Sequence, residues 1–113
     1  MLDIYQEALA DLNKPLKIQP NDAWTLSRRG ATYLMLDKYQ EALVDLNKSL
    51  GIKPNDAWAL SRRGAIYCTL GRYHEAFADL NKSLEIQPND AFALKQWGRA
   101  YLIVRVLTAI IIM

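Results

Sequence analysis

The chain repeats itself every 34 residues, and this period constrains its fold more than any other feature. Pro20, Pro54 and Pro88 each begin the same run, Pro-Asn-Asp-Ala. A glycine followed three residues later by a tyrosine keeps the same interval, at Gly30/Tyr33, Gly64/Tyr67 and Gly98/Tyr101. A fixed period of this length is typical of architectures in which one supersecondary unit stacks on the next. We therefore expect a stack of repeats.

The period divides the chain into two complete units and two partial ones. The complete units are residues 20–53 and 54–87, and the last unit, 88–113, is shortened. Residues 1–19 match the second half of a complete unit. We therefore expect a single domain over residues 1–113 that begins and ends inside a repeat.

Each complete unit reads as two helices. The first follows an Asn-Asp pair, a favoured N-cap sequence, and continues with helix-spaced apolar residues. The second begins after a break at Asp37-Lys38 or Gly71-Arg72 and ends at the next proline, which cannot extend it. The expected helices span residues 3–18, 22–35, 38–51, 56–69, 72–85 and 90–104.

Pro15 is a local departure from the repeat, because the matching positions hold Ser49 and Ser83. A proline inside a helix removes one backbone hydrogen bond and costs about 3 kcal/mol. We therefore expect the first helix to end early or to kink near Lys14.

The repeat resembles the tetratricopeptide repeat (TPR) family over residues 1–104. The family pattern has the glycine and tyrosine named above in the first helix, and a closing proline. It also has an aromatic and then a small residue at the start of the second helix, as in Tyr5/Ala8, Tyr39/Ala42 and Tyr73/Ala76. The resemblance implies an all-α solenoid of antiparallel helix pairs, with half repeats at both ends. First helices would line its concave face and second helices its convex face.

The resemblance also implies which side chains face the concave groove. These positions carry aromatic, hydroxyl and cationic groups, and Trp and Arg are enriched where binding energy concentrates. The expected peptide-binding site comprises Trp24, Ser27, Arg28, Trp58, Ser61, Arg62, Phe92, Lys95 and Arg99. The alternative for Trp24 and Trp58 is that they pack against the preceding second helix.

The neighbouring arginines, Arg29 and Arg63, have a structural interpretation instead. Their register beside the glycine places their stems between helices, so we expect the guanidinium groups to meet Asp45 and Asp79 across each hairpin. The facing partners of the glycines are expected to be the small Ala8, Ala42 and Ala76.

The expected partner is a protein or peptide segment, with acidic or C-terminal carboxylate character to suit the arginines. One TPR subclass grips the acidic C-termini of chaperones through Lys and Asn at set first-helix positions. Here those positions hold Ser27, Ala31, Trp24 and Trp58, and only the register of Arg28 and Arg62 agrees. We therefore do not assign the chain to that subclass.

Several function classes find no support in the composition. A single His74 and a single Cys68 provide no metal cluster and no catalytic constellation, so we expect no enzyme and no cofactor. A net charge of +2 with interleaved signs does not indicate nucleic acid. The lone cysteine favours a reducing compartment, and we expect a cytoplasmic location. The first residues do not read as a signal peptide.

The ending, YLIVRVLTAIIIM, is apolar apart from one arginine. It is short of the roughly 20 apolar residues of a membrane span, so a membrane role is not expected. No turn residue stands at Arg105-Val106, so the last helix should continue to about residue 111. An incidental end of a longer array is one explanation of the apolar run. A homo-oligomer contact is the one we favour, through Leu102, Val106, Leu107, Ile110 and Ile111.

The sequence therefore predicts a non-enzymatic scaffold that binds a protein segment in its groove and self-associates through its terminal helices. The alternative is a purely structural or engineered repeat fragment that assembles without a ligand of its own.

Overall fold

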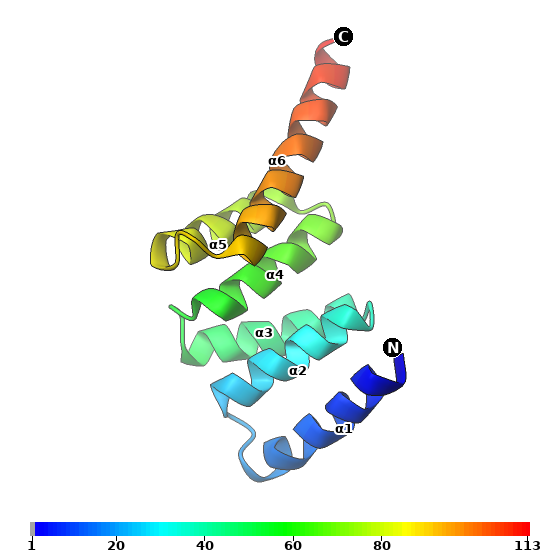
Figure 1. The fold of residues 1–113 in the computed structure, drawn as a ribbon, viewed down its shortest axis with the longest axis vertical. Helices are drawn as coiled ribbons and strands as arrows, with labels where there is room; N and C mark the ends of the chain where they lie inside the picture. The colour runs from blue at the N-terminus through cyan, green and yellow to red at the C-terminus, as the bar shows by residue number, and fades with distance from the viewer. Residues whose placement is uncertain (1) are drawn as a thin grey trace.

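The computed structural model describes residues 2–113, and these residues form six α-helices and no strand. The helices are α1 (Leu2–Ile18), α2 (Ala23–Met35), α3 (Tyr39–Ile52), α4 (Ala57–Thr69), α5 (Tyr73–Ile86) and α6 (Ala91–Ile112). Two helix pairs, α2 with α3 and α4 with α5, stack along the long axis (Figure 1). α1 lies at one end of the stack and α6 at the other. The expected all-α repeat solenoid is confirmed.

Each pair is closed by a glycine that lets the two helices approach. A Cβ atom added at Gly30 would lie 2.8 Å from Cγ of Leu46, and one at Gly64 would lie 2.7 Å from Cγ of Leu80. Both leucines are fully buried. The close partners are therefore leucines one turn beyond the expected alanines, whose backbone oxygens lie slightly farther away.

A hydrogen bond from a buried hydroxyl group also joins the two helices of each pair. Ser49 Oγ donates to the carbonyl oxygen of Ala23 at 2.7 Å, and Ser83 Oγ donates to that of Ala57 at 2.9 Å. Each bond joins the end of a second helix to the start of the first helix in the same repeat. A buried hydroxyl left without an acceptor would cost free energy, so the serines favour this register of the pair.

Pro15 does not end α1, and the expected interruption near Lys14 is wrong. The helix is continuous through Pro15 to Ile18. Pro15 is exposed and stands in the last turn, so the backbone carbonyl that loses its partner can bind water instead. Leu16 beside it is 7% exposed and anchors the end of the helix against the stack.

α6 continues past the position where the other first helices end. It spans 22 residues, and Figure 1 shows it projecting beyond the stack towards the C-terminus. The continuation predicted from the missing turn residues is confirmed. The corresponding turns elsewhere use positive φ angles, 58° at Asp37 and 75° at Gly71, and no residue of this kind interrupts α6.

The first helices of the repeats form one continuous face. α2 contacts α4 and α4 contacts α6, whereas α3 and α5 do not contact each other among the described residues. Closer spacing on one side of a stack makes that side its inner face. We call the surface of α2, α4 and α6 the inner face, and the surface of α3 and α5 the outer face.

Candidate functional site

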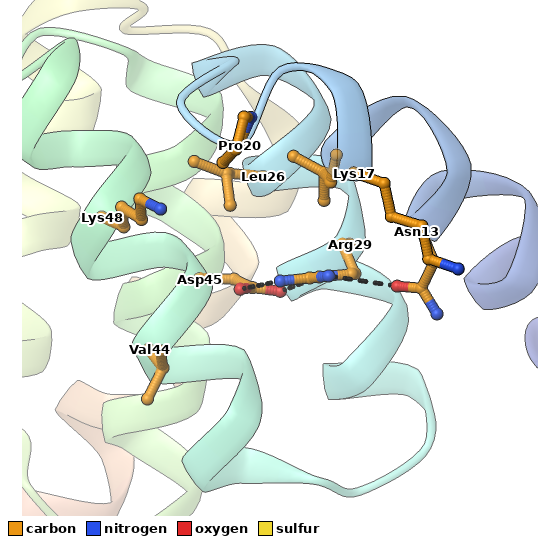
Figure 2. Close-up of a pocket in the computed structure, with 9 residues that line it drawn as sticks. Asn13, Lys17, Pro20, Leu26, Arg29, Val44, Asp45 and Lys48 are labelled. Carbon is orange, nitrogen blue, oxygen red and sulfur yellow. Dashed lines mark hydrogen bonds and ion pairs between the residues drawn. The ribbon is translucent and has the colours of Figure 1, made fainter.

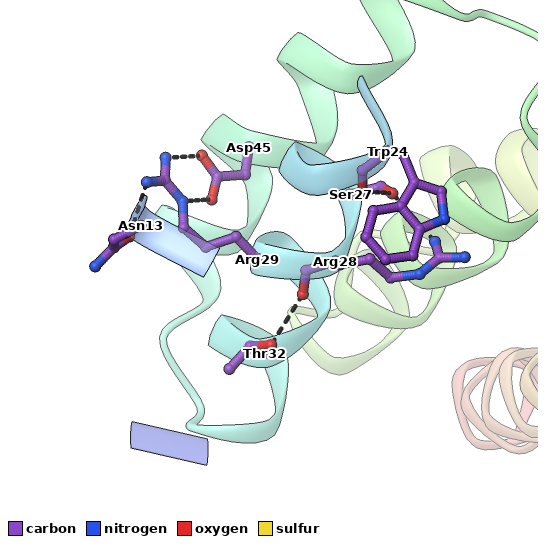
Figure 3. Close-up of polar contacts among 7 residues, drawn as sticks. All are labelled: Asn13, Trp24, Ser27, Arg28, Arg29, Thr32 and Asp45. Atoms are coloured by element: carbon purple, nitrogen blue, oxygen red, sulfur yellow. Dashed lines mark hydrogen bonds and ion pairs between the residues drawn. The ribbon is translucent and has the colours of Figure 1, made fainter. Parts of the chain in front are cut away.

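Aromatic and cationic side chains alternate along the inner face. The guanidinium carbon of Arg28 lies 4.7 Å from the ring centroid of Trp24 and 3.6 Å from that of Trp58. The same atom of Arg62 lies 4.3 Å from the centroid of Trp58 and 3.8 Å from that of Phe92. We call these five residues the arginine–aromatic ladder. Figure 3 shows the Trp24 end, with the Arg28 side chain beside the indole ring.

The ladder follows directly from the repeat. Within α2 and α4 the tryptophan and the arginine are four residues apart, which places them on the same side of the helix. The 34-residue period then sets the arginine of one repeat against the aromatic ring of the next. The sequence identified all five residues, but it did not predict that each guanidinium would be held between two rings.

Stacking covers the faces of the guanidinium groups and leaves their N–H edges to form hydrogen bonds. Arg28 Nη1 donates to Ser27 Oγ at 3.2 Å, and Arg62 Nη1 donates to Ser61 Oγ at 3.1 Å. Within residues 2–113 no carboxylate lies in salt-bridge range of either arginine. Since a guanidinium has five N–H donors, most of its capacity remains for a ligand.

The electrostatics of the ladder favour an anion. Burial lowers the pKa of Arg28, and the charge of Asp56 offsets only part of that change. Burial also lowers the pKa of Arg62, where Asp90 opposes the change and the nearby charge of Arg28 adds to it. Both groups stay charged at neutral pH because arginine starts from so high a value. The ladder is therefore a positive site that its own surroundings only partly compensate.

Four of the expected site residues lie outside the ladder. Ser27 and Ser61 are fully buried and donate to the carbonyl oxygens of Trp24 and Trp58, so they cannot line an accessible groove as expected. A hydroxyl that can bond the preceding turn is drawn into the helix interface. Lys95 and Arg99 are exposed on α6.

Arg99 lies near Cys68 of α4. Its charge offsets part of the rise that burial causes in the pKa of the Cys68 thiol. Arg99 Nη1 also donates to Oε1 of Gln96 at 3.3 Å. Arg99 is therefore close enough to contribute charge to a ligand on α4, without belonging to the ladder.

The neighbouring arginines face away from the ladder, into pockets on the other side of the first helices. Figure 2 shows the pocket around Arg29, with Asn13, Pro20 and Lys48 at its edge. Arg29 Nε and Nη2 donate to Asp45 at 2.7 and 2.8 Å, and Nη1 donates to Asn13 at 3.0 Å. The hydrogen bonds to Asp45 raise the pKa of Arg29, and burial offsets part of that rise.

The next repeat copies that arrangement. Arg63 donates to both carboxylate oxygens of Asp79 at 2.7 Å and to Asn47 at 3.0 Å. The expected pairs across the hairpins are confirmed. Because all three types of guanidinium nitrogen are bonded within the chain, these arginines connect consecutive repeats and are poor candidates for a ligand site.

Trp97 occupies the corresponding position in the last repeat, and the sequence analysis assigned it no role. Its Nε1 donates to Oδ1 of Asn81 at 2.9 Å, as Arg63 does to Asn47. Its ring stacks on Tyr101 with centroids 5.2 Å apart and meets Phe77 edge-on at 5.7 Å. The 34-residue register was the available signal, because it aligns Trp97 with Arg29 and Arg63.

Neither a metal-binding cluster nor a membrane-spanning helix occurs among residues 2–113. No three His, Cys, Asp or Glu side chains group closely enough to hold a metal ion. None of the helices described here has the length and apolar character that crossing a membrane requires.

Two segments of the chain, residues 23–56 and 57–90, match the model of the tetratricopeptide repeat family. The chain belongs to this family. TPR domains are typically a non-enzymatic fold for protein interaction. No curated protein matches the sequence significantly.

Several solved TPR domains are similar to this one. The first TPR domain of Spaghetti (RPAP3), bound to the HSP90 peptide SRMEEVD, is 26% identical with a TM-score of 0.84, and the match covers 91% of this chain and 82% of that one. The Arabidopsis OM64 TPR domain is 28% identical with a TM-score of 0.81, over 87% and 81%. The Sgt2 TPR domain from Aspergillus fumigatus shares the fold at 20% identity, with a TM-score of 0.86 over 95% and 72%.

Proposed function

We propose that this TPR chain is a non-enzymatic scaffold that binds an acidic protein segment along its inner face. One observation carries the proposal. Arg28 and Arg62 are each held between two aromatic rings, with no carboxylate in salt-bridge range among the described residues. The cytoplasmic location expected from the single cysteine belongs to the same proposal.

The geometry suits carboxylates for two reasons. A guanidinium binds a carboxylate best in its own plane, through two parallel N–H···O bonds, and stacking leaves that edge free. The rings also restrict the rotation of each arginine, so less conformational entropy is lost when a ligand binds. One arginine per repeat fits an extended segment that crosses two repeats.

The similar domain of RPAP3 supports the class of ligand, because its bound peptide SRMEEVD is acidic. That peptide therefore serves as the first probe. We expect calorimetry to detect its binding to the wild-type chain, and we expect an SRMQQVN amide, which has no carboxylate, to bind much more weakly. The probe tests the ligand class and implies no particular natural partner.

Replacing both ladder arginines, Arg28→Ala with Arg62→Ala, should weaken binding of SRMEEVD at least tenfold. The matched control is Lys48→Ala with Lys82→Ala, which removes the same charge from the rims of the two outer pockets. An equal loss in both double variants would indicate a nonspecific charge effect. Unchanged affinity in the arginine variant would remove the ladder from the site.

Self-association is a second proposal, and a different observation favours it. Five apolar residues expected at an oligomer contact are exposed on α6: Leu102, Val106, Leu107, Ile110 and Ile111. Leu102, Val106 and Leu107 also line a shallow apolar depression together with Ile103. Contiguous apolar surface of this kind marks interaction sites in soluble proteins.

Light scattering across a range of concentrations tests the second proposal. The mass should rise with concentration for the full chain and stay monomeric after residues 105–113 are deleted. A strict monomer in both cases would rule out self-association. Assembly together with failure to bind any acidic peptide would favour the alternative of a purely structural repeat.

A further inference from the structure

We infer that the surface of α6 is covered by α1 of a second copy, seated as α3 sits on α2 and as α5 sits on α4. The inference rests on the self-association proposed above and names its two surfaces. The chain itself supplies the template, because it contains the same helix-on-helix interface twice. A third use of that interface would join α6 of one molecule to α1 of the next.

Among residues 2–113, α6 is a first helix on which no second helix of its own repeat packs. A Cβ atom added at Gly98 would meet nothing within 4 Å, whereas the same atom at Gly30 or Gly64 would press on a buried leucine. Tyr101 follows Gly98 at the family spacing and is 43% exposed. The glycine therefore leaves an open place of the size that a leucine fills in the two complete repeats.

α1 has the reverse feature, because among residues 2–113 it contacts α2 alone and no first helix packs on its other side. Leu12 aligns with Leu46 and Leu80, and Ala8 aligns with Ala42 and Ala76. The aligned residues of α3 and α5 are all fully buried. Leu12 and Ala8 themselves are only partly buried, since α1 contacts α2 on its other side alone. The two residue types that pack on Gly30 and Gly64 are therefore present and available on α1.

α1 and α6 differ from the complete repeats at positions that would face each other in the proposed contact. In the complete repeats the backbone N–H of Lys38 donates to the carbonyl of Tyr33, and that of Arg72 donates to Tyr67. The aligned residues at the proposed contact are Ile4 and Tyr101. Ile4 is apolar where the others are charged, and it is 62% exposed. It would face the part of α6 where the turn is replaced by apolar helix.

The charges of the two helices are also complementary. α6 contains Lys95, Arg99 and Arg105 and no acidic residue, a formal charge of +3. α1 contains three carboxylates and two lysines, a formal charge of −1. Opposite net charge speeds encounter and disfavours pairing α6 with α6 or α1 with α1. The contact is therefore heterologous and head-to-tail, and it either closes a ring or continues as a filament.

Cysteine cross-linking tests the contact directly. Leu12→Cys and Gly98→Cys are introduced into separate chains that also carry Cys68→Ala, so that no other thiol is present. In the complete repeats a Cβ at Gly30 would lie 2.8 Å from Cγ of Leu46, and Sγ of a cysteine takes the place of that Cγ, so the two new cysteines should come within disulfide range without a clash. Mixing the two variants under mild oxidation should give a disulfide-linked dimer that contains one chain of each kind.

Each variant oxidised alone, and Gly51→Cys mixed with Gly98→Cys, are the controls, because Gly51 lies on the outer face with no neighbour nearby. None should give an efficient dimer. Dimers of the Gly98→Cys chain alone would show α6 packing on α6 and would overturn the inference. Scattering that detects association without a mixed disulfide would also overturn it, while leaving self-association intact. A strict monomer by scattering would reject both.

Discussion

At the scale of single residues, two adjacent arginines in α2 have different contacts and different roles. Arg29 makes three bonds to Asp45 and Asn13, and Asp45 is 3% exposed. Arg28 stacks between Trp24 and Trp58, and the bond to Ser27 is the only hydrogen bond of its guanidinium group among the described residues. The difference of one position turns the side chain towards the hairpin interior or towards the inner face (Figure 3).

Replacing each arginine with methionine should separate stability from binding. Arg29→Met leaves Asp45 buried without its cation, so the free energy of unfolding should fall by about 2–3 kcal/mol. Arg28→Met keeps an apolar stem between the rings and should change stability by less than about 1 kcal/mol. Urea denaturation measures both values. Equal destabilisation by the two substitutions would contradict the division of roles.

The sequence was sufficient to predict the Arg29–Asp45 pair and not the stacking of Arg28. The pair follows from the register of glycine, arginine and aspartate, which recurs in both complete repeats. The stacking depends on which rotamer each tryptophan adopts between successive repeats, and a sequence pattern does not fix that choice. Ser27 and Ser61 were misplaced for a related reason, because their hydroxyl groups bond to the helix backbone.

At the scale of helices, the turn residues and the prolines predicted the helix boundaries correctly, and Pro15 was the exception. The helix boundaries predicted from them lie within two residues of those observed for α1 to α5, and the continuation of α6 followed from its missing turn. The prediction at Pro15 was wrong because the free-energy cost of a proline in a helix depends on the surroundings of the backbone carbonyl that loses its hydrogen bond. In the exposed last turn of α1, water can satisfy that carbonyl.

The glycines of the first helices should respond to alanine in opposite directions. Gly64→Ala would press against Leu80, and overpacking of this kind costs about 1–3 kcal/mol, more than the helix propensity that alanine adds. Gly98→Ala meets no neighbour, so it should stabilise the monomer by up to about 1 kcal/mol.

Thermal unfolding at low concentration checks both glycine variants. The same Gly98→Ala chain should associate more weakly at high concentration, since the added methyl group would meet Leu12 of the second copy. Stabilisation without weaker association would contradict the proposed contact.

At the scale of the whole molecule, the stack has two unlike ends and one face that carries the ladder. The proposed peptide site is the ladder, and the proposed contact between copies uses α1 and the side of α6 that bears Gly98, so a peptide and a second copy would use different surfaces. Binding and assembly are therefore compatible, and a chain of several copies would present several ladders to one ligand or to several.

The contact between copies has one unfavourable feature that can be tested. Asp11 aligns with Asp45 and Asp79, but the residue facing it on α6 would be Trp97 instead of arginine. Covering a carboxylate without a cation is costly. Asp11→Asn should therefore strengthen association, by roughly 3- to 10-fold. Sedimentation equilibrium measures the change, and weaker association of Asp11→Asn would argue against this register.

If ligands bind at the ladder, an NMR titration with SRMEEVD should give a specific pattern of chemical-shift changes. The side-chain Nε–H signals of Arg28 and Arg62 and the indole N–H of Trp58 should show the largest shifts. The Nε–H signals of Arg29 and Arg63, already bonded to aspartates, should move little. Binding at the ladder is contradicted if the largest shifts fall on Arg29, Arg63 and the outer pockets, with the ladder signals unchanged.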